Sequence, residues 1–418
     1  EQSLISVALW DEVKDVMNVY AMMKLCGYKD EDINIDIVPL FETMEGLDKS
    51  ENVMKTLYDH PVYKKHLARR NNKQIIMLGF SDGTKDGGYL KANWQIYTSK
   101  EKLTKISEEN GMKVVFFDGR GGPPARGGGK THDFYASQGK TIANNQIELT
   151  IQGQTITSVF GNKDQAKFNF EQLLTAGIEN DVFKSVKKDL NDKERQLISE
   201  LADISYQKYS DLKAHPMFVP YLQEMSTLEY YGRTNIGSRP SKRGAGSELK
   251  FEDLRAIPFV GSWSQLKQNV PGFFGFGFAL KTLMDAGRFD EIKDLYKGSD
   301  FFKTLVLNSM MSMNKTYFPL TYYMRNNEKF GEFWNILFAE FSLSKEMMLE
   351  LTGYKILMQE EPLNRKSVKI REKIVLPLLS IQQYALMKIQ KGEGNRESYE
   401  KLVMRSLFGN INASRNSA

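Results

Sequence analysis

The sequence contains the stretch Gly119-Arg120-Gly121-Gly122-Pro123-Pro124-Ala125-Arg126-Gly127-Gly128-Gly129-Lys130, and directly before it a β-branched and aromatic run, residues 113–118. That run predicts a buried strand. Six of the eleven residues from Gly119 to Gly129 are glycines, so the loop exposes backbone N–H groups, and two arginines add positive charge. Such a loop predicts an anion-binding site built from N–H and guanidinium groups. A flexible linker is the alternative, but linkers rarely follow directly on a buried strand.

Two known phosphate- and RNA-binding patterns resemble this loop and do not fit it. The phosphate-binding loop that ends in Gly-Lys-Thr requires a glycine five residues before Gly129, where this chain has Pro124. Two Arg-Gly-Gly triplets are also present, but the disordered RNA-binding tails that use them repeat the triplet many times.

The composition sets limits on function. The 418 residues are 41% hydrophobic and 26% charged, and the net charge of +5 is small for this length, which does not favour nucleic-acid binding. No apolar run approaches the roughly 18 residues of a membrane span. A single cysteine, Cys26, excludes an intramolecular disulfide and favours a reducing, cytoplasmic location. The chain begins with Glu1 rather than methionine, which suggests a fragment.

Strands and helices alternate in the first part of the chain. Strands are expected at 33–41, 74–80 and 113–117, and helices at 9–28, 43–70 and 89–110, the last preceded by a turn at 83–88. This alternation is typical of a parallel sheet, and α/β barrels build their sites at the carboxyl ends of the strands. Glu42 and Asp82 follow the first two strands. Two carboxylates beside the arginine loop predict a hard-cation site, although each could instead cap the following helix.

The rest of the chain is predicted to be mainly helical. Residues 147–159 alternate around Gln152-Gly153 and predict a β-hairpin, and residues 164–229 have a helical pattern. A polar loop at 237–247 precedes a strand-like run at 254–260, in which Arg255 requires an anionic partner. Residues 264–418 predict helices packed through methionine and aromatic side chains.

Several motifs resemble phosphoenolpyruvate carboxylase in order and spacing, over about residues 33–418. They are Val38-Pro39-Leu40-Phe41-Glu42-Thr43, Gly79-Phe80-Ser81-Asp82-Gly83-Thr84-Lys85-Asp86-Gly87-Gly88, the glycine loop, Gly237-Ser238-Arg239-Pro240-Ser241-Lys242-Arg243, Leu254-Arg255-Ala256-Ile257-Pro258 and the terminal Ala413-Ser414-Arg415-Asn416-Ser417-Ala418. The resemblance implies a helix-rich α/β fold: the C-terminal part of a (β/α)8 TIM-type barrel in residues 1–265 and an all-helical region in residues 266–418.

The resemblance also implies a cytoplasmic, anaplerotic lyase that carboxylates phosphoenolpyruvate with bicarbonate, yielding oxaloacetate and phosphate through carboxyphosphate and an enolate. It implies a homotetramer when full length, with no nucleic acid or membrane partner. The implied site comprises the Mg²⁺ or Mn²⁺ ligands Glu42 and Asp82, the substrate-binding Arg120, Arg255 and Arg239, the catalytic Arg126 and Lys85, and the aspartate-binding Lys315, Arg371 and Asn416, together with Arg126.

Three departures from the family matter. Asp118 stands where the family usually has histidine, and Ala125 replaces a loop glycine. The family's catalytic histidine motif, Thr-Ala-His-Pro-Thr, is absent from this chain. We therefore expect this chain to be the C-terminal half of the enzyme, requiring the other half for turnover. A degenerate, non-catalytic homologue that binds a phosphorylated metabolite is the alternative.

Overall fold

The protein is described from a computed structural model, which covers residues 3–7, 12–150, 154–182, 189–234 and 249–414. The structure contains a five-stranded sheet of β1 (Ser3–Val7), β2 (Ile35–Phe41), β3 (Lys73–Gly79), β4 (Lys113–Gly119) and β5 (Ile147–Leu149). All four neighbouring pairs are parallel, and the spatial order follows the chain order. A doubly wound sheet reverses its strand order at a switch point, whereas consecutive βα units in a barrel keep theirs. The strand order is therefore that of part of a barrel whose sheet is not closed. The prediction of a helix-rich α/β fold is confirmed.

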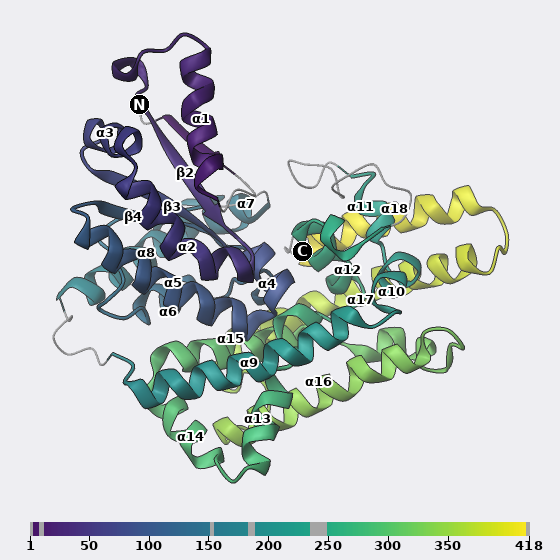
Figure 1. The fold of residues 1–418 in the computed structure, drawn as a ribbon. Coiled ribbons are helices and arrows are strands. Elements are labelled where there is room, and N and C mark those ends of the chain that lie inside the picture. Colours follow the sequence, from purple (N-terminus) through teal and green to yellow (C-terminus); the bar gives the residue numbers. More distant parts are fainter. Residues whose placement is uncertain (1–2, 8–11, 151–153, 183–188, 235–248, 415–418) are drawn as a thin grey trace.

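Helices connect the strands along the sheet (Figure 1). They are α1 (Val13–Leu25), α2 (Met44–Asp59), α3 (Pro61–Arg69), α4 (Phe80–Gly87), α5 (Tyr89–Glu109) and α6 (Thr131–Ala136), with the short η1 (Asp30–Asp32) and η2 (Pro124–Arg126). Thr43 caps α2 by accepting a hydrogen bond from the Gly46 N–H group. The single helix expected over 43–70 is divided at Pro61, which begins α3 because proline is tolerated in a first turn.

The sheet is buried on both faces, as parallel sheets are. On one face Ile37 and Phe41 join the main core. On the other face Val38, Ile75 and Val115 form a separate small cluster. This double burial explains why the strands appear in the sequence as nearly continuous apolar runs.

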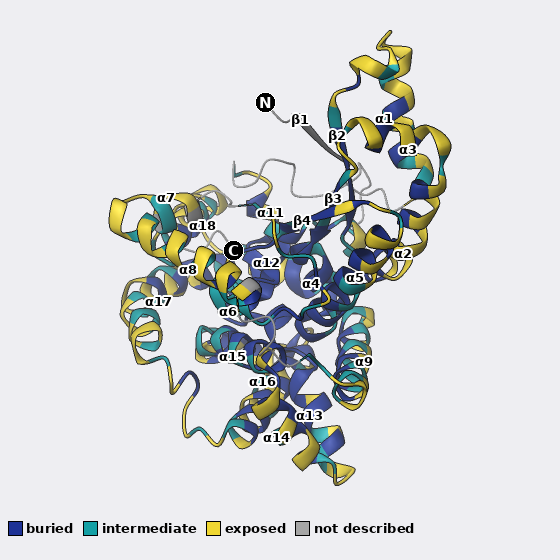
Figure 2. Cartoon of the chain, turned by 90° about the vertical axis from the view of Figure 1, so that its left-hand side faces the viewer, coloured by how far each residue is buried: buried dark blue, intermediate teal, exposed yellow. Residues whose placement is uncertain are grey.

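Helices make up most of the remaining chain (Figure 1). They are α7 (Gln154–Phe160), α8 (Lys163–Val182), α9 (Asp192–Ala214), α10 (Phe218–Met225), α11 (Leu228–Tyr231), α12 (Ala256–Gln265), α13 (Phe276–Asp285), α14 (Phe289–Gly298), α15 (Asp300–Asn314), α16 (Gly331–Thr352), α17 (Pro362–Gln390) and α18 (Arg396–Ser414), with η3 (Phe251–Asp253), η4 (Val270–Gly272) and η5 (Phe318–Asn326). The main core continues from the sheet into α13, α14, α15 and α16. Buried residues accordingly occupy the middle of the molecule, and exposed residues occur along α1, α8 and α17 (Figure 2).

Three local predictions were wrong. The hairpin over 147–159 is absent: β5 pairs parallel to β4, and residues 154–160 form α7. The turn expected at 83–88 is largely helix α4, because tertiary packing overrides its glycine content. The strand expected at 254–260 is mostly α12, which begins after Arg255. A short apolar run does not distinguish a strand from a buried helix by pattern alone.

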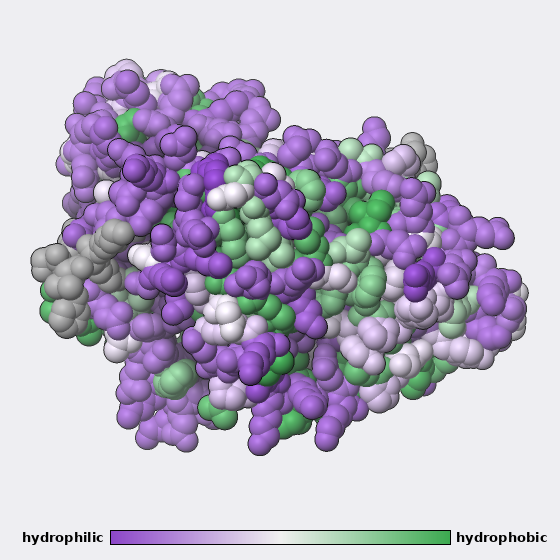
Figure 3. All heavy atoms as spheres, turned by 90° about the horizontal axis from the view of Figure 1, so that it is seen from below, coloured by the Kyte–Doolittle hydropathy of each residue, from purple (hydrophilic) through white to green (hydrophobic). Residues whose placement is uncertain are grey.

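The face seen from below Figure 1 carries apolar residues among hydrophilic ones (Figure 3). The exposed apolar side chains of the described residues include Phe278 on α13 and Phe338 on α16. In the part of the chain that the structure describes, no helix combines the length and the apolar character needed to cross a membrane.

Candidate functional site: an arginine-lined cavity at the end of the sheet

The glycine loop has a defined conformation. Five backbone hydrogen bonds close it on itself, among them Gly121 N–H to Arg126 O (3.3 Å), Gly128 N–H to Pro123 O (3.0 Å) and Gly129 N–H to Gly122 O (3.0 Å). Gly127 has a φ of +70°, and a side chain there would also overlap Phe80 at the start of α4. The glycines thus allow the loop to turn sharply while it packs on α4, which a flexible linker would not do.

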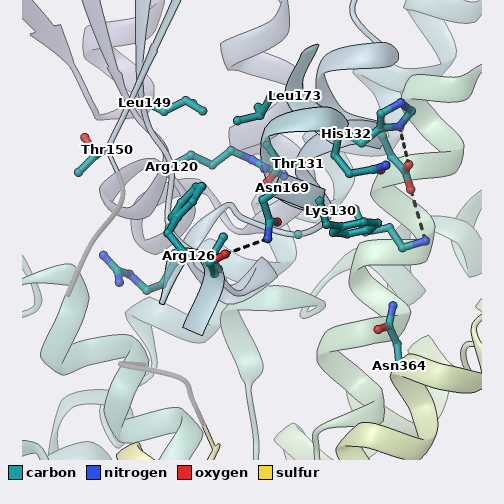
Figure 4. A pocket seen from close by; sticks show the side chains of 18 residues that line it. Arg120, Arg126, Lys130, Thr131, His132, Leu149, Thr150, Asn169, Leu173 and Asn364 are labelled. Carbon is teal, nitrogen blue, oxygen red and sulfur yellow. Dashed lines mark hydrogen bonds and ion pairs between the residues drawn. The ribbon is translucent and has the colours of Figure 1, made fainter. Parts of the chain in front are cut away.

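The loop forms one wall of a cavity of about 560 Å³ (Figure 4). Leu149 and Thr150, at the end of β5, form another part of the wall, and α7 and α8 contribute apolar and amide side chains. The cationic and polar lining comes from the glycine loop and the start of α6: Arg120, Arg126, Lys130, Thr131, His132 and Asp133. A cavity with mixed walls of this kind fits a small organic anion.

Arg120 extends across this cavity toward Thr131 (Figure 4). Its side chain is buried, and its guanidinium group stacks on Phe134 at 4.3 Å from the ring centre. Its Nε and Nη2 atoms have no hydrogen-bond partner among the described residues. Burial lowers the pKa of Arg120, with opposing contributions from Tyr135, Tyr89 and nearby aspartates. A buried guanidinium group with unsatisfied donors provides a strong site for a phosphate or carboxylate oxygen.

Asp118, two residues before Arg120, is completely buried in an ion pair. Its Oδ2 atom lies 2.7 Å from Lys100 Nζ and accepts a hydrogen bond of 2.8 Å from the Tyr135 hydroxyl group. Lys100 lies on α5 and is also buried. Burial lowers the pKa of Lys100, while the Asp118 carboxylate opposes this effect. The residue in the family's histidine position is thus neutralised by a lysine from the neighbouring helix.

Arg126 lines the same cavity, but its guanidinium group points away from that of Arg120 (Figure 4). It is buried beside Asp82 and Tyr231. Burial lowers the pKa of Arg126 to about 10, and the Asp82 carboxylate opposes the shift. The backbone carbonyl of Arg126 accepts a hydrogen bond from Ser81, so the loop is tied to the first turn of α4.

Glu42 and Asp82 lie at the same end of the sheet. Glu42 follows β2, and its Cβ and Oε2 atoms lie against Gly79, the last residue of β3. Asp82 lies three residues further along, in the first turn of α4. Both side chains are half-buried, and neither lines the 560 Å³ cavity. Asp82 also faces Arg126, so its carboxylate is close to a positive charge.

This donor set fits a Mg²⁺ or Mn²⁺ ion. Such ions are commonly held by one or two carboxylates, with water and substrate oxygens completing the coordination. Within the described residues no cluster of three or more His, Cys, Asp or Glu side chains is arranged for a metal ion. Glu42 and Asp82 therefore suit a metal shared with a substrate rather than one enclosed by protein alone.

The other residues expected at the site lie on nearby elements. Lys85 is buried in α4, with its Nζ atom 4.6 Å from the centre of the Phe251 ring. Arg255 precedes α12, which packs against α4 and η2. Arg239 lies outside the described residues.

Lys315 and Arg371, for which the family resemblance implies aspartate binding, line a second, small cavity of about 50 Å³, next to Lys267. Burial, together with the charges of Lys267 and Arg371, lowers the pKa of Lys315 to about 8. Glu372 offsets part of this positive charge, since it lies 2.9 Å from Lys267 Nζ. Arg126 lines the other cavity instead, and Asn416 lies outside the described residues.

Sequence reasoning missed Lys100 and Tyr135, which hold Asp118. For Lys100 the sequence contains a weak indication of burial. Lys100 occurs at helical spacing with Ile96, Tyr97 and Leu103, on the apolar face of α5. A lysine in such a position predicts a buried partner of opposite charge. Its partner could not be identified without the tertiary structure.

The comparisons with known proteins point to one family. The family model described as phosphoenolpyruvate carboxylase matches residues 1–414. The chain is 32% identical to a phosphoenolpyruvate carboxylase of Corynebacterium efficiens over 93% of its own length and 44% of that protein. For the proteins of the same name in Corynebacterium diphtheriae and Corynebacterium glutamicum the identities are 31% and 33%, over 98% and 92% of this chain and 46% and 42% of those proteins.

The chain thus spans less than half the length of these curated relatives. The match nevertheless extends over nearly all of its own residues, including the strand ends, the glycine loop and the helical region. This chain belongs to the phosphoenolpyruvate carboxylase family.

Proposed function

We propose that this chain forms the C-terminal part of an enzyme that joins bicarbonate to phosphoenolpyruvate, releasing oxaloacetate and phosphate. Family membership supports this proposal, and one structural observation carries it. Arg120 presents buried, unsatisfied donors to a cavity at the carboxyl end of a parallel sheet, close to Arg126. Such a cavity suits the phosphate and carboxylate groups of phosphoenolpyruvate.

The residues of this chain would bind and shield the reactants. Arg120 and Arg255 would hold the phosphate group through charge-assisted hydrogen bonds. Arg126 would cover the site from the glycine loop, and Lys85 and Arg239 would add positive charge nearby. Excluding water matters because carboxyphosphate is hydrolysed readily when exposed to solvent. The burial of Arg126 and the packing of the loop on α4 fit this shielding role.

Glu42 and Asp82 would hold Mg²⁺ or Mn²⁺ at the strand ends. When bound, the metal ion would neutralise negative charge that develops on the enolate oxygen. Arg126 lies beside Asp82, so its guanidinium group would add positive charge next to the metal ion. The general base required for the reaction would come from outside this chain.

A second candidate is a homologue that binds a phosphorylated metabolite without turnover. The Asp118–Lys100 ion pair favours it, because a buried, paired carboxylate cannot donate a hydrogen bond to the substrate as a histidinium group would. In that case the anion cavity would be retained, whereas carboxylation would be lost.

The test uses the intact enzyme that contains this chain, assayed for oxaloacetate with Mg²⁺, bicarbonate and phosphoenolpyruvate. We expect activity that falls strongly in Arg120→Gln, with Lys102→Gln, an exposed lysine on α5, as the control. Binding of phosphoenolpyruvate without oxaloacetate formation would favour the second candidate. Absence of both binding and turnover would overturn the proposal.

We also propose that Lys315, Arg371 and Asn416 bind aspartate as a feedback inhibitor. The shared cavity of Lys315 and Arg371 supports this assignment. Its volume of about 50 Å³ accommodates only one or two water molecules, so the cavity would have to open for a dicarboxylate. Arg126 would have to leave the arginine-lined cavity to contact aspartate. It would then no longer shield the reactants.

A further inference from the structure

Lys100, Asp118 and Arg120 form a chain of alternating charges inside the protein. Asp118 lies in β4, and Arg120 directly follows Gly119, the last residue of that strand. The Asp118 carboxylate is close enough to raise the pKa of Arg120 against the larger effect of burial. Asp118 nevertheless makes its ion pair with Lys100, at 2.7 Å, while Arg120 Nε and Nη2 have no partner among the residues described.

A carboxylate beside an unsatisfied guanidinium group would normally form a bidentate pair with it. Here the Oδ2 atom is held by both Lys100 and the Tyr135 hydroxyl group. Tyr135 is itself fixed, because its backbone carbonyl accepts a hydrogen bond of 2.7 Å from Asn180 on α8. Phe134 stacks on the Arg120 guanidinium group and holds it in the cavity. Neighbouring elements thus hold the Asp118 carboxylate and the Arg120 guanidinium group apart.

We propose that Lys100 is a positioning residue that binds Asp118 and thereby keeps Arg120 available for the substrate anion. This inference rests on the proposed function, in which Arg120 binds the phosphate group. Lys100 does not touch the cavity: it acts through Asp118. With Lys100 present, the three groups carry a net charge of +1, and the unpaired charge lies on Arg120. Without Lys100, Asp118 would turn to Arg120 and the net charge would be zero.

The proposal predicts an unusual pattern among variants. In Lys100→Gln the carboxylate competes with the anion for Arg120, so binding weakens. In the double variant Lys100→Gln/Asp118→Asn the competitor is also removed, and the net charge returns to +1. Anion binding should therefore recover, although two buried charges and their ion pair are gone. A purely structural role for Lys100 predicts no such recovery.

The experiment measures binding of sulfate to the intact enzyme by titration calorimetry, because sulfate keeps its double negative charge over the pH range used. We expect Lys100→Gln to bind sulfate about ten- to a hundredfold more weakly, the range for one charge-assisted contact. The double variant should lie within about threefold of the unchanged protein, as should the control Lys102→Gln. Thermal unfolding of each variant verifies that the proteins compared are folded.

If Lys100→Gln is unfolded, the double variant still tests the proposal, because it must bind sulfate normally.

The outcomes separate this inference from the proposed function. If Arg120→Gln binds sulfate as tightly as the unchanged protein, the assignment of Arg120 fails, and this inference fails with it. If Arg120→Gln loses binding but Lys100→Gln does not, only the role of Lys100 is overturned. Equal loss in Lys100→Gln and in the double variant would show that Lys100 merely supports the fold.

Discussion

Glu42 lies so close to Gly79 that a side chain at position 79 would overlap the Glu42 Cβ atom. This contact joins the ends of β2 and β3, and it fixes the carboxylate beside the first turn of α4. The position of Glu42 therefore depends on the absence of a side chain on the neighbouring strand.

We predict that Gly79→Ala displaces Glu42 and weakens metal binding. Overpacking should destabilise the protein by about 1–3 kcal/mol. Affinity of the intact enzyme for Mn²⁺, measured from the electron paramagnetic resonance signal of the free ion, should fall at least about tenfold, the equivalent of one lost charged contact. Glu42→Gln and Asp82→Asn should show similar losses.

The matched control is Gly177→Ala. Gly177 lies in α8, is exposed and has no atom within 4 Å of an added methyl group. Alanine should stabilise this helix by about 1 kcal/mol or less and leave Mn²⁺ binding unchanged. Unaltered Mn²⁺ affinity in Gly79→Ala, Glu42→Gln and Asp82→Asn would rule out this metal site.

Lys315 provides a test of the effector site. If aspartate binds between Lys315 and Arg371, Lys315→Ala should raise the inhibition constant of the intact enzyme about ten- to a hundredfold. Asn314→Ala tests whether the preceding residue, rather than Lys315, binds aspartate. Lys369→Ala removes an exposed lysine from α17 that does not line the cavity. Both of these variants should be inhibited normally. An unchanged constant in Lys315→Ala would refute its assignment, and an enzyme insensitive to aspartate would refute the site.

Glu340 should make stability depend on pH. It is buried on α16 and accepts hydrogen bonds from the backbone N–H groups of Gly275 (3.0 Å) and Phe278 (3.2 Å) at the start of α13. Burial raises the pKa of Glu340 to about 7, against the effect of these donors. Between about pH 4.5 and pH 7 the folded state holds a proton that the unfolded state has released. The contribution of Glu340 to the free energy of unfolding is therefore fully present at low pH. It falls by on the order of 3 kcal/mol as the pH rises to 7.

Glu340→Gln keeps an oxygen acceptor for the two N–H groups and cannot ionise. It should be more stable than the unchanged protein at pH 8, and this advantage should disappear toward pH 4.5. Urea unfolding at several pH values measures it, with the exposed Glu346→Gln on the same helix as the control. A constant difference between the two proteins across this range would contradict the raised pKa.

The isolated chain should produce no oxaloacetate from phosphoenolpyruvate, bicarbonate and Mg²⁺, because it lacks the family's histidine motif. Malate dehydrogenase and NADH report oxaloacetate as it forms. Folding of the isolated chain must be established first by circular dichroism and thermal unfolding. Turnover comparable with that of the intact enzyme would show that the general base lies within these residues.

The sequence by itself determined the alternation of strands and helices and the residues at the strand ends. β2, β3 and β4 were predicted to within two residues, because strands buried on both faces leave a continuous apolar pattern. Glu42, Asp82 and the glycine loop were predicted to meet because parallel strands end at one edge of a sheet. The resemblance to the family identified the arginines and lysines expected to act there.

Only the tertiary structure decided which charges pair and which stay available. Lys100 and Asp118 are 18 residues apart and lie on different elements, and the sequence carries no record of their distance. The tertiary structure also decided the secondary structure of α4 and α12, for which the local pattern predicted a turn and a strand. Burial against neighbouring elements outweighs weak intrinsic propensity there. Pairing and packing are long-range properties, so the availability of Arg120 follows from the fold and not from its sequence context.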